Sequence, residues 1–239
     1  MPTLATLGRT AVVSPHLDDA VFACGRLLAA HPGAQVITVF AGDPGPEVGP
    51  TDWDRRCGFT EGVAAMAARR EEDRQALTLL EAQPVWLPFL DAQYRRPGAP
   101  PLAPAAVAQA LKSALDPFAP QTVLFPLGLF HADHALVHQA CLGALQDRID
   151  LTLLAYEDAL YRGLPGQVQQ RLMALAQAGW QATPARFARH GAAAAKARAV
   201  RCYASQLRGF GEGGHDDLEA PERAWRLEHL PAGSDDDAS

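Results

Sequence analysis

Short apolar runs alternate along the chain with longer stretches that carry apolar residues at helical spacing. The short runs predict strands at residues 11–14, 35–40, 84–87, 122–125 and 151–155. The longer stretches predict helices at residues 19–30, 60–82, 104–115 and 133–147. This alternation is typical of βαβ units joined by right-handed crossovers. We therefore expect an α/β fold, a Rossmann-like three-layer sandwich with a mostly parallel sheet and helices on both faces.

The last third of the chain has a different pattern. Helical spacing at residues 166–178 and 190–207 predicts a helical C-terminal extension of the same domain. We expect a single domain over residues 1–230, followed by an acidic, disordered tail at 231–239. Residues 42–59 follow the second predicted strand and are rich in proline and glycine without any helical or strand period. Long loops of this kind are often functional, so this segment is expected either to cover a substrate or to form a surface excursion.

Histidine and aspartate residues come directly after two of the predicted strands. Ser14-Pro15-His16-Leu17-Asp18-Asp19 follows strand 11–14, and His131-Ala132-Asp133-His134 follows strand 122–125. Open α/β sheets bind ligands outside the carboxyl ends of the strands, where the strand order reverses. In a 3-2-1-4-5 core order, the first and fourth strands are neighbours at that point. We therefore expect the two motifs to meet, although they are far apart in the sequence.

The first motif has the residue types of a catalytic zinc site, in which three protein ligands leave one position for water. The spacing His16-x-x-Asp19 lets both side chains reach one ion. Asp18 is then left to face a water molecule as a general base. Taken alone, two aspartates at a helix start are typical capping residues, but the neighbouring histidine favours a metal site.

The second motif places two imidazoles close together. His131 and His134 lie three residues apart on the first turn of a helix, so both can face one cavity. One of them can bind a metal while the other donates a hydrogen bond or a proton to a substrate. Asp133 can orient an imidazole, as carboxylates next to metal ligands often do. His138, one turn further along, is expected to be structural.

The overall composition excludes some classes of function. The chain has 239 residues, of which 48% are hydrophobic and 20% charged, and its formal charge of −6 argues against a nucleic-acid partner. No apolar run is long enough for a membrane span, and the first ten residues lack the pattern of a signal peptide. The four cysteines are scattered without a Cys-x-x-Cys pair, which favours reduced thiols in a cytoplasmic protein.

Together the two motifs resemble those of the LmbE-like, or PIG-L, family of zinc-dependent N-acetylglucosamine deacetylases. The first motif of that family usually reads His-Pro-Asp-Asp, so Leu17 departs at the proline position. The similarity covers about residues 8–205 and includes weaker matches at 69–73, 90–91 and 156–158. A tyrosine usually found near the second motif is not obvious here, where Leu129 and Phe130 precede His131. A tyrosine contact to the substrate would need Tyr156 or another residue to reach the site.

The resemblance implies a role for each matching residue. His16, Asp19 and His134 would bind Zn²⁺, although Fe²⁺ would fit the same ligands. Asp18 would be the general base. His131 would polarise the acetyl carbonyl or protonate the leaving amine.

Further roles follow from the same resemblance. Asp133 would hold the His131 ring, and Arg69 and Asp91 match positions that contact the sugar. The implied activity is the release of acetate from an N-acetylated amino sugar, a small-molecule substrate. A homo-oligomer is compatible with the sequence.

Two other classes of function compete with this interpretation. A catalytically inactive metal- or sugar-binding module would share the fold, but it would have little physical reason to keep a carboxylate such as Asp18 beside the ion. A nucleotide-binding Rossmann enzyme would need a glycine-rich turn after the first strand. The turn carries His16, Asp18 and Asp19 instead, and the two carboxylates would repel a pyrophosphate.

Overall fold

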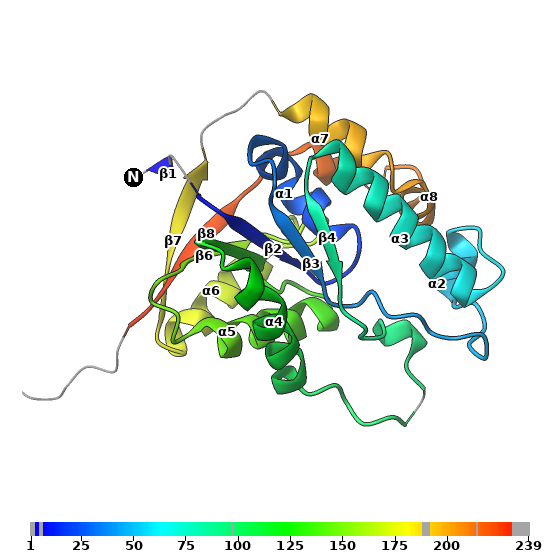
Figure 1. The fold of residues 1–239 in the computed structure, drawn as a ribbon, viewed down its shortest axis with the longest axis horizontal. Coiled ribbons are helices and arrows are strands. Elements are labelled where there is room, and N and C mark those ends of the chain that lie inside the picture. Colours follow the sequence, from blue (N-terminus) through cyan, green and yellow to red (C-terminus); the bar gives the residue numbers. More distant parts are fainter. Residues whose placement is uncertain (1–2, 5–6, 97, 188–191, 214, 231–239) are drawn as a thin grey trace, which may run out of the picture.

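A mixed sheet of eight strands lies at the centre of the computed structural model, which describes residues 3–4, 7–96, 98–187, 192–213 and 215–230 (Figure 1). The strand order in this part of the chain is β1-β7-β8-β6-β5-β2-β3-β4. The strands are β1 (Thr3–Leu4), β2 (Thr10–Ser14), β3 (Gln35–Thr38), β4 (Gln83–Trp86), β5 (Thr122–Pro126), β6 (Thr152–Tyr156), β7 (Trp180–Phe187) and β8 (Ala224–His229). The helices are α1 (Asp19–Ala30), α2 (Asp52–Arg56), α3 (Gly62–Leu79), α4 (Pro104–Phe118), α5 (Ala132–Leu145), α6 (Gln167–Gln177), α7 (Ala193–Val200) and α8 (Ala204–Phe210), with short 3₁₀ helices η1 (Ala92–Tyr94) and η2 (Asp216–Glu219).

The five predicted strands form the parallel part of the sheet in the expected order. β2 pairs with β3 on one side and with β5 on the other, β4 extends the sheet beyond β3, and β6 extends it beyond β5. Read from β4 to β6, this is the predicted 3-2-1-4-5 order. The order reverses between β2 and β5, where Val12 lies opposite Leu124. The carboxyl ends of these two strands therefore open side by side at one edge of the sheet.

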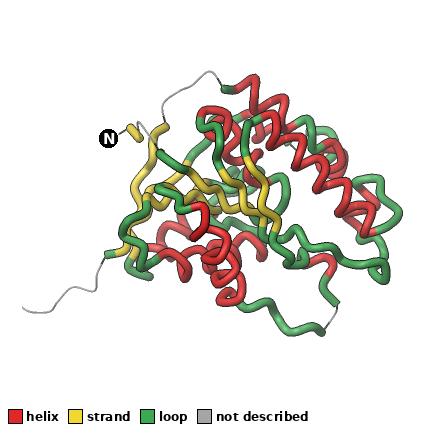
Figure 2. Tube along the Cα trace, viewed as in Figure 1, coloured by secondary structure: helices red, strands yellow, loops and turns green. Residues whose placement is uncertain are grey.

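Helices cover both faces of the sheet, as predicted for a three-layer sandwich (Figure 2). Val13 and Phe125 belong to a core with α4, α5 and α6, whereas Val12 and Leu124 belong to a core with α1, α3 and α7. Neighbouring residues of one strand thus face opposite helical layers, as the two-residue period of a strand requires. The central strands β2 and β5 are buried at every position because both of their faces are covered.

The predicted helical C-terminal extension contains helices, but it also contains two strands that the sequence did not predict. α6 lies where a helix was predicted, but β7 and β8 follow it and extend the sheet, with β8 antiparallel to both β6 and β7. Pro184 and small residues give β7 a weak strand pattern, and both strands depend on pairing with distant segments. The helix predicted at 190–207 is divided into α7 and α8 by a turn before Tyr203.

The segment 42–59 also contains structure that its composition does not predict. α2 forms in it because Thr51 and Asp54 make a reciprocal capping box, in which each side chain accepts a hydrogen bond from the other residue's backbone N–H. A helix this short has no measurable period. The tail predicted at 231–239 lies outside the described residues, and the single domain over 1–230 stays a prediction. Within the described chain, the helices are too short or too polar to cross a membrane.

The turn after β5 depends on one glycine. Gly128 has a φ of +79°, and a Cβ atom there would lie 2.8 Å from the Cβ atom of His138 on α5. Both features exclude a side chain, because a positive φ strains L residues and the contact would be too close. Gly128 therefore allows α5 to start close to the end of β5, where the second motif lies.

We expect Gly128→Ala to lower the free energy of unfolding by about 2 kcal/mol or more, from backbone strain and the clash with α5. Urea denaturation followed by circular dichroism measures this change. Gly143→Ala is the control, because Gly143 is exposed in the last turn of α5 with open space around it. That substitution should stabilise the protein by about 0.5–1 kcal/mol. Equal effects of the two substitutions would contradict the role of Gly128.

Candidate metal centre and active site

The first motif forms a tight turn between β2 and α1, held by the Ser14 side chain. The Ser14 hydroxyl donates to the backbone oxygen of His16 at 2.6 Å and accepts from the backbone N–H of Ala20 at 2.9 Å. Asp18 occupies the N-cap position of α1, but its side chain makes no capping hydrogen bond. Helix capping therefore does not explain this buried carboxylate.

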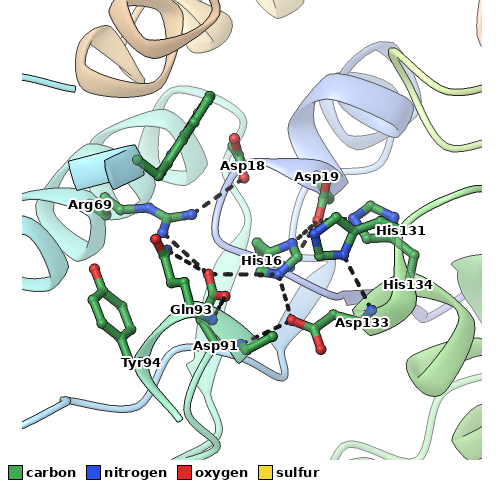
Figure 3. A network of polar contacts seen from close by, with 12 residues as sticks. His16, Asp18, Asp19, Arg69, Asp91, Gln93, Tyr94, His131, Asp133 and His134 are labelled. Atoms are coloured by element: carbon green, nitrogen blue, oxygen red, sulfur yellow. Dashed lines mark hydrogen bonds and ion pairs between the residues drawn. The ribbon is translucent and has the colours of Figure 1, made fainter. Parts of the chain in front are cut away.

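His16 and Asp19 face each other across this turn. The Oδ2 atom of Asp19 accepts from the backbone N–H of His16 at 2.9 Å and lies 3.1 Å from its Nδ1 atom. Asp19 Oδ2 also lies 3.2 Å from Nε2 of His134 on α5. One carboxylate oxygen thus touches an imidazole from each motif, as Figure 3 shows. The expected meeting of the two motifs is present in the structure.

The second motif positions His131 as the N-cap of α5. Its Nδ1 atom accepts a hydrogen bond from the backbone N–H of Asp133 at 3.2 Å. In the neutral ring the proton must then be on Nε2, so Nε2 is a hydrogen-bond donor. Burial lowers the pKa of His131 most, and the neighbouring His16 and His134 lower it further. The neutral donor form is therefore favoured near pH 7.

The carboxylate of Asp158, just after β6, orients His134. Asp158 Oδ1 lies 2.6 Å from Nδ1 of His134, and Oδ2 accepts from the backbone N–H groups of Gly128 and Leu129, both at 2.9 Å. A carboxylate only accepts, so the Nδ1 atom of His134 donates to Asp158, which leaves Nε2 as the ring nitrogen that faces Asp19 and can bind a cation. In the sequence, Asp158 belonged only to a weaker match to the family at 156–158, with no role assigned to it. Its position at the end of the strand beside β5 was the signal that could have placed it at the site.

Three of these side chains have the arrangement that a cation requires. One ligand atom from each of His16, Asp19 and His134 lies within 4.8 Å of the other two. Two imidazoles and one carboxylate are a usual set for a catalytic zinc ion, and Asp158 supplies the orienting carboxylate that such sites contain. The residues therefore fit a divalent cation. His16, His131 and Asp133 form a second group of the same size.

Asp133 does not hold the His131 ring with its carboxylate, as the resemblance implied. Instead, Oδ1 accepts from Arg95 at 2.7 Å, and Oδ2 accepts from the backbone N–H of Ala92 and lies 3.4 Å from His16 Nε2. The His131 ring is hydrogen-bonded to the backbone N–H of Asp133 rather than to its carboxylate. The reason is that capping turns Nδ1 of His131 toward the helix, so the carboxylate is directed at the other motif.

Burial of many charges together shifts the pKa values at this site. Burial and the adjacent Asp19 charge raise the pKa of Asp18 to about 6. Burial acts to lower the pKa of His134, but the charges of Asp19 and Asp158 outweigh it and raise the pKa to about 9. The site thus concentrates negative charge around its imidazoles, which favours a cation between them.

The two predicted sugar-contacting residues lie at the same cavity. Arg69 of α3 is 5% exposed, and its guanidinium lies 4.0 Å from Asp18 Oδ1 and 3.7 Å from Asp91 Oδ2. Its Nε atom has no hydrogen-bond partner among the described residues. Asp91 accepts from the backbone and side chain of Gln93, which fixes its carboxylate at the start of η1. The cavity therefore has a guanidinium that can donate to a ligand and a fixed carboxylate that can accept from one.

A cavity of about 360 Å³ contains these groups. Its lining includes His16, Asp18, Asp19, Arg69, Asp91, His131 and His134, together with residues that the sequence did not single out: Phe22, Trp53, Gln93, Ala159, Leu160, Tyr161, Gln206 and Phe210. Trp53 comes from the segment 42–59, which was expected either to cover a substrate or to form a surface excursion, and α8 contributes Gln206 and Phe210. The segment 42–59 thus does reach the cavity, as a wall made by α2.

A comparison with protein families identifies the chain. Residues 11–145 match the PIG-L family, described as GlcNAc-PI de-N-acetylase. The protein belongs to the PIG-L, or LmbE-like, family. The match covers more than half of the chain and includes both motifs, so the resemblance stated from the sequence is confirmed.

Several proteins that the chain resembles are described as deacetylases. The chain is 34% identical over 173 residues to 2'-N-acetylparomamine deacetylase of Streptomyces fradiae, a match that covers 65% of this chain and 58% of that protein. The structure of the A40926 pseudoaglycone deacetylase Dbv21 has a TM-score of 0.77 with 28% identity, over 95% of this chain and 100% of that one. A deacetylase of the teicoplanin biosynthetic pathway, solved as a triple mutant, has a TM-score of 0.76 with 25% identity, over 94% and 100% of the two chains.

This protein departs from the PIG-L pattern at two positions. Leu17, at the usual proline, is buried in a small cluster with Met66 and Tyr94 and so contributes packing. The usual tyrosine is not replaced by Tyr156, whose hydroxyl donates to the backbone of β2. Tyr161 reaches the cavity instead, with its ring stacked on His131 at 6.3 Å. His138 bonds to the backbone oxygen of Pro126, as expected for a structural residue.

We expect Asp158→Asn to weaken binding of Zn²⁺ or Co²⁺ about 10- to 100-fold. The amide can still accept from the backbone, but its NH₂ group would face Nδ1 of His134 and force the ring proton onto Nε2. Metal titration against a chromogenic chelator measures the change. Glu157→Gln is the matched control, because Glu157 instead bonds to Trp225 and Arg223. Unchanged affinity in Asp158→Asn would contradict the orienting role.

Proposed function

We propose that this protein hydrolyses the acetamide of an N-acetylated amino sugar, such as an N-acetylglucosaminide, to acetate and a free amine. The observation that carries the proposal is the grouping of His16, Asp19 and His134 beside Asp18, a buried carboxylate that does not cap its helix. The deacetylase activity of the relatives supports the reaction type. The cavity volume of about 360 Å³ suits a substrate of the size of one sugar ring with its substituents.

In this proposal His16, Asp19 and His134 hold a divalent cation, Zn²⁺ by ligand preference, with Fe²⁺ as an ion that fits the same set. When bound, such a cation polarises the acetamide carbonyl and lowers the pKa of water. Asp158 keeps the Nε2 lone pair of His134 available by holding the proton on Nδ1. The remaining steps are carried out by side chains of this chain.

Asp18 takes a proton from the attacking water molecule while the water oxygen bonds to the carbonyl carbon. Its pKa, raised to about 6, leaves it ionised near pH 7 and still basic enough to accept a proton. Nε2–H of His131 donates to the carbonyl oxygen as negative charge develops there. The C–N bond then breaks, and Asp18 passes its proton to the leaving amine nitrogen. Water has added across the amide, which balances the reaction.

Arg69 and Asp91 orient the sugar in this proposal. The Arg69 guanidinium and the fixed carboxylate of Asp91 line the cavity and can bond to hydroxyl groups, which suits a polyol substrate better than an apolar amide. Asp133 contributes by holding His16 and Arg95 in place. We place the activity in the cytoplasm, and the four free thiols support a reducing compartment.

The proposal is tested by metal analysis of protein purified without chelators, together with an acetate-release assay on a panel of N-acetylglucosaminides. We expect about one divalent ion per chain and acetate release that stops after chelation and returns with added metal. Metal binding with no release from any N-acetyl substrate would favour the inactive binding module. A chain that takes up no divalent ion would contradict the proposal itself.

We expect Asp18→Asn to lower kcat by about 10²- to 10⁴-fold while metal content is unchanged, because an amide cannot accept the proton. Asp19→Asn should instead release the metal, since it removes the carboxylate shared by both imidazoles. Mass spectrometry of bound metal and initial rates separate the two effects. Asp150→Asn serves as a control, because Asp150 is exposed and pairs with Arg148. Turnover by Asp18→Asn at the wild-type rate would exclude Asp18 as the base.

A further inference from the structure

Three aromatic side chains form a continuous apolar wall on the cavity that the proposed chemistry does not use. The wall consists of Phe22, Phe210 and Trp53, with ring centroids 6.3 Å apart for the first pair and 5.3 Å for the second. Phe22 is one helical turn after Asp18 on α1, so the wall begins beside the proposed base. It continues through Phe210 to Trp53.

Two of the three wall residues are partly exposed to solvent. Trp53 and Phe210 are half-buried, whereas Phe22 is fully buried. Side chains that served only packing would have their rings enclosed, but the side chains of Trp53 and Phe210 are partly exposed and line the cavity. An apolar ring surface at a cavity that otherwise presents charged groups is suited to bind an apolar part of a ligand.

The Trp53 ring is held in a fixed orientation. Its Nε1–H donates to the side-chain oxygen of Gln206 at 2.9 Å, so the polar edge of the indole is satisfied. A Cβ atom at Gly209 would lie 2.9 Å from the indole, which shows that the absence of a side chain there allows the close contact of α2 with α8. The guanidinium of Arg56 lies 5.4 Å from the ring centroid and donates to the backbone oxygen of Gly209.

Other contacts fix α2 to the substrate side of the cavity. The Tyr94 hydroxyl donates to buried Asp54 at 2.7 Å, and the Thr51 hydroxyl donates to Gln93 at 2.6 Å. Gln93 in turn donates to Asp91, the proposed sugar-contacting carboxylate. The wall is therefore connected through side chains to the group that would bind the sugar, so both are preorganised together.

α8 is anchored with similar strength. Glu72 of α3 accepts from the backbone and hydroxyl of Ser205, and Asp73 accepts from the Tyr203 hydroxyl at 2.8 Å. The segment 42–59 is thus held between η1 and α8 by hydrogen bonds on both sides. Such a segment sets the shape of the cavity rather than opening and closing over it.

We propose that this aromatic wall is the subsite for an apolar, ring-bearing aglycone attached to the amino sugar, and that Trp53 is its specificity-determining residue. The inference rests on the proposed deacetylation, because the sugar must sit with its acetamide at Asp18. The charged group that lies against the indole is a guanidinium. A neutral or anionic aglycone is therefore favoured over a polycationic one, such as an aminoglycoside.

The test compares phenyl and methyl N-acetylglucosaminides of the same anomeric configuration, together with an N-acetylated aminoglycoside. In the metal-loaded protein, we expect kcat/KM for the phenyl glycoside to exceed that of the methyl glycoside about tenfold, since a stacked ring adds about that much binding. Most of the difference should be in KM. The aminoglycoside should be turned over more slowly than the phenyl glycoside.

Trp53→Ala should reduce the phenyl-to-methyl ratio to about one, whereas Trp53→Phe should keep most of it because a ring remains. Thermal unfolding and metal content establish that both variants are folded. Arg55→Ala is the matched control on the same helix, since Arg55 is exposed and pairs with Asp52. It should keep the wild-type ratio.

The outcomes distinguish this inference from the proposed function. The subsite would be refuted by acetate release with a phenyl-to-methyl ratio of kcat/KM near one in the wild-type protein, or by a ratio that Trp53→Ala leaves unchanged. Neither result would contradict the proposed deacetylase activity. Preference for the aminoglycoside would also refute the subsite. If no glycoside releases acetate, the proposed function fails. Calorimetric binding of phenyl and methyl glucosaminides then tests the aromatic wall independently of catalysis. Tighter phenyl binding that Trp53→Ala abolishes would support it, and equal binding would refute it.

Discussion

The parallel pairing of β2 with β5 is the constraint on which the site depends. Thr10, Ala11 and Val12 lie opposite Thr122, Val123 and Leu124, and both strands are covered by helices on both faces. A shift of this register by one residue would exchange the faces of every side chain on a strand, so the two cores hold it strongly. The two motifs that follow these strands are therefore brought together by the burial of apolar residues that take no part in the chemistry.

At this edge the fold buries several ionisable groups close together, which is costly unless each has a partner. The carboxylate of Asp158 reduces the free-energy cost of burial because both of its oxygens have partners. One is directed at His134, and the other accepts from the backbone of the turn that carries the second motif. The same side chain thus shapes the turn and sets the protonated nitrogen of the imidazole. Asp18 is left without such a set of partners, which is consistent with its proposed work as a base.

The cavity wall opposite the polar groups has a different origin. α2 is too short to be stable alone and exists because its capping box and its hydrogen bonds to η1 and α8 hold it. These contacts join three segments that are far apart in the sequence. In a family whose relatives act on different N-acetylated compounds, such a wall is a place where specificity can change without altering the metal-binding residues.

The sequence by itself determined the parallel core of the sheet, its order, and the meeting of His16 and Asp19 with His134, because strand periodicity and the rule for ligand binding at the strand-order reversal are local or topological. Tertiary structure decided what depends on distant partners. It directed the Asp133 carboxylate to His16 rather than to the ring of His131, and it placed Asp158 against His134. It also added β7 and β8 to the sheet and brought Trp53 to the cavity. The spacing of apolar and polar residues does not predict these placements. Each is set by hydrogen bonds and packing between segments that meet only in the folded chain.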